Sequence, residues 1–155
     1  MFALEITGKE RKPRVVVNTP FEESMAQFSP DRRWVAYQTN ESNRFEIVVQ
    51  AFPEASGKWQ VSTGGGIQPR WRADGKELYF IAPDGKLMAA AITATDVTFA
   101  AGTPMALFPA PLAPGSGAHK QEYIASRDGR FLLNQPAEAF TAAPITLIVN
   151  WKPKP

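Results

Sequence analysis

The sequence predicts an all-β fold built from repeated antiparallel β-hairpins. One pattern occurs three times: a short strand, a turn that contains an Asp, and a second strand, with the turns at 29–33, 72–76 and 126–130. In each turn a basic residue follows two positions after the Asp. The composition agrees, because 14 prolines and 11 glycines spread along 155 residues favour many short strands and turns over long helices.

The spacing of the pattern indicates which kind of β fold to expect. Asp31 and Asp74 lie 43 residues apart, and Asp74 and Asp128 lie 54 apart. A loop rich in proline and glycine at 109–119 accounts for the longer interval. A period of roughly 40–45 residues made of short strands is typical of β-propeller blades. A β-sandwich would explain the strands but not the repeated turn.

The chain is therefore expected to be a single propeller segment, residues 1–155, of about three blades. Its predicted parts are an outer half-blade at 1–20, a four-stranded antiparallel blade at 22–63, a second such blade at 67–108 and an incomplete blade at 120–151. The glycine run 64–66 is expected to carry the chain from the outer strand of one blade to the inner strand of the next.

Short apolar or alternating segments mark the individual strands. The predicted strands cover 2–7, 14–17, 25–28, 34–38, 45–50, 58–62, 68–71, 77–81, 86–93, 97–108, 121–125, 130–134 and 145–151. Residues 102–104, Gly-Thr-Pro, are expected to interrupt the strand at 97–108. Proline is tolerated there if this strand lies at the edge of its sheet. Strands such as 77–81 are apolar on both faces, so both faces of their sheet should be covered.

Three segments carry a resemblance to a known family. Phe28–Tyr37, Gln68–Gly75 and Ala82–Met88 resemble the repeats of TolB-like (WD-type) β-propellers, and Pro144–Trp151 resembles the closing segment of such chains. More closely, the chain resembles the C-terminal propeller part of bacterial serine/threonine protein kinases. Arg32 departs from the family, which usually has glycine there; because arginine disfavours positive φ, we expect a different type of turn at this position.

The resemblance implies a non-catalytic module that binds a protein or a small ligand, as the sensor or docking part of a larger bacterial protein such as a kinase, in the periplasm or the cytoplasm. The sequence contains no Gly-rich phosphate loop, no His-Arg-Asp motif and no Asp-Phe-Gly motif, so no catalytic residues are predicted. Two alternatives stay open: the accessory propeller of a prolyl-oligopeptidase-type hydrolase, and a carbohydrate-binding lectin that uses exposed tryptophans.

The predicted binding residues are Gln27, Gln68 and Arg70, which fall on inner strands and are expected to line the mouth of an axial channel. No metal or cofactor is predicted, because the chain has no cysteine and one histidine. The loop containing Ser116 and His119 does not match the G-x-S-x-G elbow of a hydrolase.

Several other residue groups have a structural interpretation beside a functional one. The turn aspartates are expected to bond their own backbone, with calcium binding as the alternative. The tryptophans are expected to pack between blades, with a sugar- or base-stacking platform as the alternative. The basic cluster within 8–13 is expected to be a solvated turn, with an anion site as the alternative.

The net charge, the length of the apolar segments and the number of predicted blades limit which partners we expect. The net charge of +2 is not concentrated on one segment, so nucleic-acid binding is not predicted. No apolar run approaches the roughly 20 residues of a membrane helix, so no membrane insertion is predicted. Closed propellers have typically 4–8 blades. The chain is therefore expected to be a fragment of a longer protein, or to self-associate so that two copies close a ring head to tail.

Overall fold

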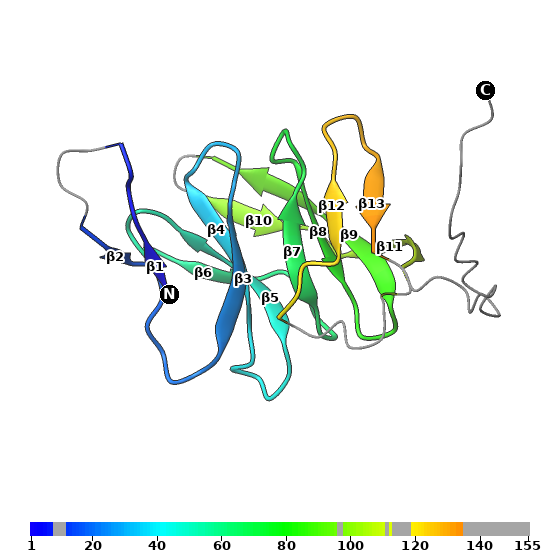
Figure 1. Ribbon diagram of the computed structural model, residues 1–155, viewed down its shortest axis with the longest axis horizontal. Coiled ribbons are helices and arrows are strands. Elements are labelled where there is room, and N and C mark those ends of the chain that lie inside the picture. The colour runs from blue at the N-terminus through cyan, green and yellow to red at the C-terminus, as the bar shows by residue number, and fades with distance from the viewer. Residues whose placement is uncertain (8–11, 96–97, 111, 113–118, 135–155) are drawn as a thin grey trace, which may run out of the picture.

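The computed structural model describes residues 1–7, 12–95, 98–110, 112 and 119–134. These residues form 13 β-strands and no helix (Figure 1). The all-β prediction is confirmed. The predicted final strand at 145–151 and most of the predicted loop at 109–119 lie outside the described residues.

The first sheet is a four-stranded antiparallel meander in sequence order. Its strands are β3 (Glu23–Phe28), β4 (Trp34–Thr39), β5 (Glu46–Ala51) and β6 (Lys58–Gln60). Every residue of β4 is buried, and so is all of β5 except its last residue. Both faces of this sheet are therefore covered, as an apolar strand without alternation requires.

The second sheet has the same antiparallel strand order, but its last strand is divided into two parts. Its strands are β7 (Ile67–Trp71), β8 (Glu77–Ile81), β9 (Lys86–Ala94), β10 (Phe99–Ala101) and β11 (Met105–Pro109). β8 occupies one edge of β9, and both β10 and β11 pair antiparallel with its other edge. The outer strand is thus interrupted between Ala101 and Met105, where the sequence predicted the interruption.

Two shorter pairs of strands complete the described structure. β1 (Phe2–Ala3) pairs with β2 (Arg14–Val15), and β12 (Tyr123–Ala125) pairs with β13 (Phe131–Leu133). These strands are shorter than predicted. After β2 the chain stays close to its own start, because the amides of Val16 and Val17 both donate to the carbonyl of Met1, at 3.0 and 3.3 Å.

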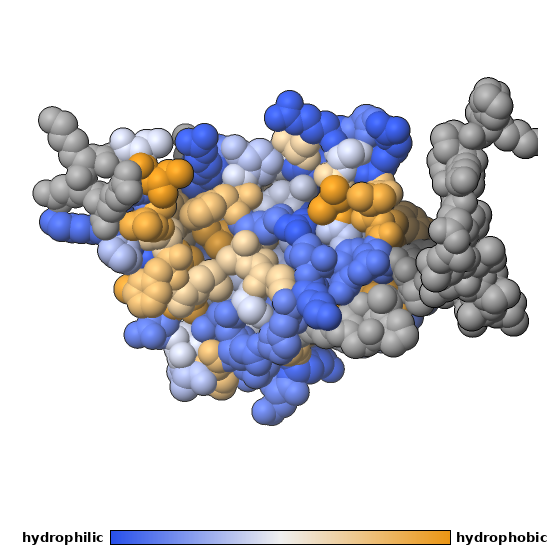
Figure 2. All heavy atoms as spheres, viewed as in Figure 1, coloured by the Kyte–Doolittle hydropathy of each residue, from blue (hydrophilic) through white to orange (hydrophobic). Residues whose placement is uncertain are grey.

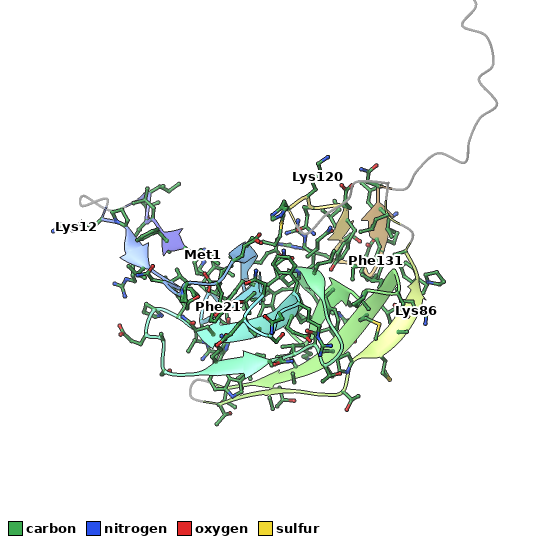
Figure 3. All side chains as sticks on the ribbon, turned by 90° about the horizontal axis from the view of Figure 1, so that it is seen from below. Met1, Lys12, Phe21, Lys86, Lys120 and Phe131 are labelled. Carbon is green, nitrogen blue, oxygen red and sulfur yellow. The ribbon has the colours of Figure 1, made fainter. Side chains whose placement is uncertain are left out.

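Three apolar cores alternate with the sheets. The core between the two large sheets contains Trp34, Ile47 and Val49 from one side and Leu78, Phe80 and Ile92 from the other. A second core joins the opposite face of the second sheet to β12 and β13, and a third joins the opposite face of the first sheet to the N-terminal segment. The pair β1–β2 and the hairpin that carries Phe131 consequently lie at opposite ends of the molecule (Figure 3).

The two large sheets share a β-bulge as well as their strand order. Pairing shifts register between Ser24 and Gln27 in β3 and between Ile67 and Arg70 in β7. Met25 and Gln68, which occupy the bulges, have positive φ values of 55° and 59°. A bulge inserts one residue that the neighbouring strand does not pair. The 43-residue repeat therefore extends from the turns into the backbone of the first strand of each sheet.

The expectation of a different turn at Arg32 is wrong. Arg32 has φ 62° and its amide donates to the Ser29 carbonyl at 2.9 Å, while Gly75 has φ 74° and makes the equivalent bond to Arg72 at 2.9 Å. Local bonds hold the arginine in this conformation: the Trp34 amide donates to Ser29 Oγ at 3.0 Å, and the Ser29 hydroxyl donates to the Asp31 carboxylate. These contacts outweigh the steric preference of a residue with a Cβ atom.

In the third hairpin, the backbone hydrogen bond that closes the turn spans one residue fewer than in the first two. The Arg72 amide donates to the carbonyl of Glu77, five positions on, whereas the Ser126 amide donates to the carbonyl of Arg130, four positions on. A shift of one residue turns a strand's side chains to opposite faces. Leu132 is accordingly 70 % exposed, although Leu78, at the matching distance from the turn glycine, is fully buried.

The left-handed conformation of Arg32 predicts an unusual stabilising substitution. We expect Arg32→Gly to raise the free energy of unfolding by about 0.5–1 kcal/mol, because glycine removes a steric penalty of roughly 1–2 kcal/mol but adds unfolded-state entropy. Urea denaturation measures this change. The matched control is Gly85→Ala: Gly85 has φ 76° and no atom within 4 Å of an added Cβ, so we expect it to destabilise by about 1–2 kcal/mol. A destabilised Arg32→Gly variant would contradict this account of the turn.

Candidate functional site

The predicted binding residues lie on the first strands of the two sheets. β7 packs beside β3 and β4, and β12 packs beside β7. Gln27 and Arg70 occupy equivalent positions, 43 residues apart, and both are half-buried. Gln68 is fully buried. The structure thus brings the three residues into one region, but it leaves only two of their side chains partly open to solvent.

Gln68 connects its sheet to neighbours on both sides. The bulge leaves its main-chain groups outside the ladder of its own sheet, and its amide donates to Gln38 Oε1 of the first sheet at 2.8 Å. Its carbonyl accepts a hydrogen bond of 2.8 Å from the Tyr123 hydroxyl, and its side-chain oxygen accepts one of 2.9 Å from the Glu122 amide. One residue of β7 is therefore bonded to both adjacent units.

Further hydrogen bonds extend this set of contacts beyond Gln38 on one side and beyond Glu122 on the other. Gln38 Nε2 donates to Ser24 Oγ at 3.0 Å, within the first sheet. The Asn134 amide donates to the Glu122 carbonyl at 2.7 Å, and Asn134 Nδ2 donates to the Glu122 carboxylate. Gln38, Gln68 and Glu122 are all buried. We call this set, Ser24, Gln38, Gln68, Glu122, Tyr123 and Asn134, the inter-sheet polar chain.

One donor of the inter-sheet polar chain is not used. Gln68 Nε2 is buried and has no hydrogen-bond partner among the described residues. A buried donor without an acceptor costs about 1–3 kcal/mol. An oxygen atom of a water or a ligand at this position would therefore be stabilising, so Gln68 can contribute to a binding site through this one group.

Arg70 supplies a partly desolvated cation beside this chain. Its Nε donates to the Tyr123 carbonyl at 3.4 Å, and burial lowers its pKa from the usual value, with the nearby Tyr123 acting in the opposite direction. Gln27 takes part through its carbonyl, which accepts a bond of 3.2 Å from Trp71 Nε1. The side chains of Gln27 and Arg70 remain the predicted binding groups.

Glu46 is a buried carboxylate that sequence analysis did not single out. It accepts hydrogen bonds from the Ser62 hydroxyl, from the Gly65 amide at 3.0 Å and from Arg44 Nε at 2.6 Å. Gly65 has φ 102°, in the segment that joins β6 to β7. The carboxylate thus holds the crossing between sheets. The available signal was a single acidic residue at the start of the apolar strand 46–51.

The turn aspartates bond their own backbone, as predicted. Asp31, Asp74 and Asp84 accept bonds of 3.2, 3.0 and 3.2 Å from the amides of Arg33, Lys76 and Lys86, each two positions on. Hydrogen bonds from Lys86 lower the pKa of Asp84, and those from Ser126 and Arg130 lower the pKa of Asp128. Within the described ranges, no three acidic or histidine side chains gather where they could hold a metal ion.

The tryptophans predicted to pack between units do so where the structure describes them. The rings of Trp34, Trp59 and Trp71 lie 5.1, 5.5 and 6.5 Å from the ring of Phe99, which comes from the outer strand of the second sheet. Trp151 and Ser116 lie outside the described residues. His119 is exposed, and its Nδ1 lies 3.2 Å from the Glu22 carboxylate.

Comparison with known proteins adds no assignment. A scan against protein-family models and a search of curated proteins both found no match to this chain. In the part of the chain that the structure describes, no helix has the length and apolar character to cross a membrane. The fold and the site therefore define an all-β protein with two antiparallel meander sheets and a buried polar chain between them.

The three tyrosines predict how stability depends on pH. Burial raises the pKa of Tyr37 to about 12, with the charges of Glu23 and Glu41 adding to it, and burial and a hydrogen bond to Glu77 raise the pKa of Tyr79 to about 12. Burial also raises the pKa of Tyr123 well above 10. Because the unfolded chain loses these protons first, near pH 10, stability should be full below that pH and fall as the pH rises toward the folded-state values.

Urea denaturation at a series of alkaline pH values measures this loss, and absorbance at 295 nm reports phenolate formation. We expect phenolate to form together with unfolding, and Tyr123→Phe to reduce the pH-dependent part of the loss. Independent ionisation of all three tyrosines near pH 10 in a protein that stays folded would contradict the buried environments described above.

Proposed function

We propose that this chain is a segment of a β-propeller and serves as a non-catalytic module that binds a protein or a small ligand. In this proposal it is the sensor or docking part of a larger bacterial protein such as a serine/threonine kinase. The resemblance of its repeated motifs to TolB-like propellers supports the class of protein. The arrangement of the two meander sheets supports the fold.

The observation that carries the proposal is the bonding of neighbouring first strands. β7 is joined to the first sheet through Gln38 and to β12 through Tyr123 and Glu122. In a propeller the first strand of every blade lies nearest the central channel, so contacts between first strands are the ones that a radial arrangement requires. The outer strands β6 and β10 also come into contact across the first core.

The crossing between the sheets is a second support. The chain leaves β6, the last strand of one meander, and enters β7, the first strand of the next, through Gly64–Gly66. Glu46 fixes this crossing through Ser62 and Gly65. The glycine run therefore connects the last strand of one sheet to the first strand of the next, which supports the predicted crossing from an outer strand to the following inner strand.

Apolar faces remain open at both ends of the described structure. Phe2 and Val15 pair across β1–β2 and are 67 % and 53 % exposed, while Ile124 and Leu132 pair across β12–β13 and are 52 % and 70 % exposed. Figure 2 shows apolar side chains over both of these regions, on the left and on the right. Exposed apolar faces of this kind mark interaction surfaces. We propose that a further blade covers them, supplied by a second copy that closes the ring head to tail.

The binding surface of the proposed module is the region of the inner strands. Gln27 and Arg70 present an amide and a guanidinium there, and Gln68 Nε2 is a buried donor without a partner on the same strand as Arg70. The lectin alternative requires solvent-facing tryptophans, whereas Trp34, Trp59 and Trp71 are used in packing. No observation on the described residues favours the hydrolase-accessory alternative.

Light scattering coupled to size-exclusion chromatography tests the assembly. We expect a mass of twice the 17.0 kDa of one chain. Leu132→Asp should return the protein to a monomer, because it places a charge in the proposed contact. The matched control is Leu107→Asp, since Leu107 is 43 % exposed on β11, outside the proposed contact. We expect this control to remain dimeric.

The variants must keep the fold for this comparison, so circular dichroism accompanies each measurement. Leu132 is largely exposed, and surface substitutions usually change stability by less than about 0.5 kcal/mol. A wild-type chain that stays monomeric and soluble would refute head-to-tail closure. A dimer that Leu132→Asp leaves intact would refute the contact assigned to β12–β13.

A further inference from the structure

A cleft of about 810 Å³ lies between the N-terminal segment and the first turn of the first sheet. Leu4 and Ile6 line it on one side, and Phe28 and Phe52 line it on the other. The two phenylalanine rings meet edge to face, with centroids 4.9 Å apart. Sites for small molecules are typically clefts of about 300–1,000 Å³ with mainly apolar walls and a few polar groups. The volume and the apolar walls of this cleft fit that description.

The charged groups of the cleft are mainly cations. Among the described residues, Lys12, Arg14 and Arg32 line it, against one carboxylate, that of Glu5. Arg14 faces the Glu54 carboxylate at 3.7 Å, and Lys12 also has an interaction partner. The Arg32 guanidinium makes no hydrogen bond or ion pair with the described residues. Of the cations that line the cleft among the described residues, Arg32 is therefore the one available to an anionic ligand.

Arg32 holds its position at a steric cost. Its φ of 62° matches those of Gly75, Gly85 and Gly129, which occupy the same place in the other three Asp-containing turns. A left-handed conformation costs a residue with a Cβ atom roughly 1–2 kcal/mol. Strained positions of this kind concentrate at functional sites, and the inference runs from the observed strain to a function. The turn that borders this cleft thus has an arginine at the position where the turns at 72–76, 82–86 and 126–130 have glycine. Local bonds account for the backbone conformation, but they do not account for the choice of an arginine side chain over glycine.

We propose that this cleft binds a free amphipathic carboxylate, with the carboxylate on Arg32 and the apolar part on Phe28 and Phe52. A guanidinium presents parallel N–H donors that match the two oxygens of a carboxylate. One available cation among the described residues suits a head group with a single negative charge better than a phosphate, which carries nearly two. This proposal does not rest on the propeller or on its assembly, because the cleft is formed by the N-terminal segment and the first sheet.

Isothermal titration calorimetry with dodecanoate tests the proposal, using the full chain below the concentration at which dodecanoate forms micelles. We expect dodecanoate to bind, acetate to bind far more weakly because it lacks the apolar part, and dodecyltrimethylammonium to bind more weakly because its charge is opposite. Amide shifts in NMR spectra should map the dodecanoate site to residues 28–32 and 52.

Arg32→Gly is the discriminating variant. We expect it to weaken dodecanoate binding about tenfold, the effect of losing a hydrogen bond to a charged group. The same substitution should raise stability, as argued for the turn above, so weaker binding cannot be attributed to unfolding. Arg127→Ala is the matched control, because Arg127 is an exposed arginine in the turn of the third hairpin, outside the cleft. It should leave the affinity unchanged.

Three results would overturn the proposal. One is the absence of dodecanoate binding at ligand concentrations up to about 1 mM. A dissociation constant of about 1 mM or lower is expected of a ligand of this size with modest contacts. Another is equal affinity for dodecanoate and dodecyltrimethylammonium, which would show an apolar surface without charge recognition. The third is an Arg32→Gly variant that binds dodecanoate as tightly as the parent protein.

Discussion

The β-bulge at Gln68 sets the relation between the sheets. It releases one amide and one carbonyl from the ladder of β7, and buried main-chain groups of this kind must find partners. Gln38 accepts from the amide on one side, and the Tyr123 hydroxyl donates to the carbonyl on the other. Hydrogen bonds are directional, whereas the apolar cores on either side stabilise many relative orientations. The polar contacts therefore select one placement of the three units.

Glu46 has a complementary role on the connection between the sheets. Its carboxylate binds the Ser62 hydroxyl and the Gly65 amide, so the chain leaves β6 and approaches β7 along a defined path. The apolar core lies between the two faces that these two sets of polar contacts hold in place. Ring contacts between Trp34 and Phe99 belong to this core, and they depend on the same alignment.

Sequence reasoning found most of the local structure, because strands, turns and breaks follow from neighbouring residues. The order of the strands in both meanders, the interruption before Met105 and the backbone bonds of the turn aspartates were all predicted correctly. The failures involve contacts that sequence neighbours do not determine. Arg32 adopts the turn of a glycine because Ser29 and Asp31 hold it. The one-residue shift in the third hairpin could not be predicted, because its Asp128-Gly129 motif is the same as Asp74-Gly75 in the second hairpin.

The candidate site was predicted only in part. Gln27 and Arg70 were predicted to lie on inner strands, and they lie on β3 and β7, the first strands of the two large sheets. That they line the mouth of a channel stays a prediction. The burial of Gln68 was not foreseen, since its partners Gln38 and Glu122 are 30 and 54 residues away. Hydrogen exchange at the Gln68 amide tests the role of the bulge most directly. We expect it to be among the most protected amides, and Gln38→Leu to accelerate its exchange while the amides of β8 stay protected. Rapid exchange of this amide in the parent protein would contradict the account.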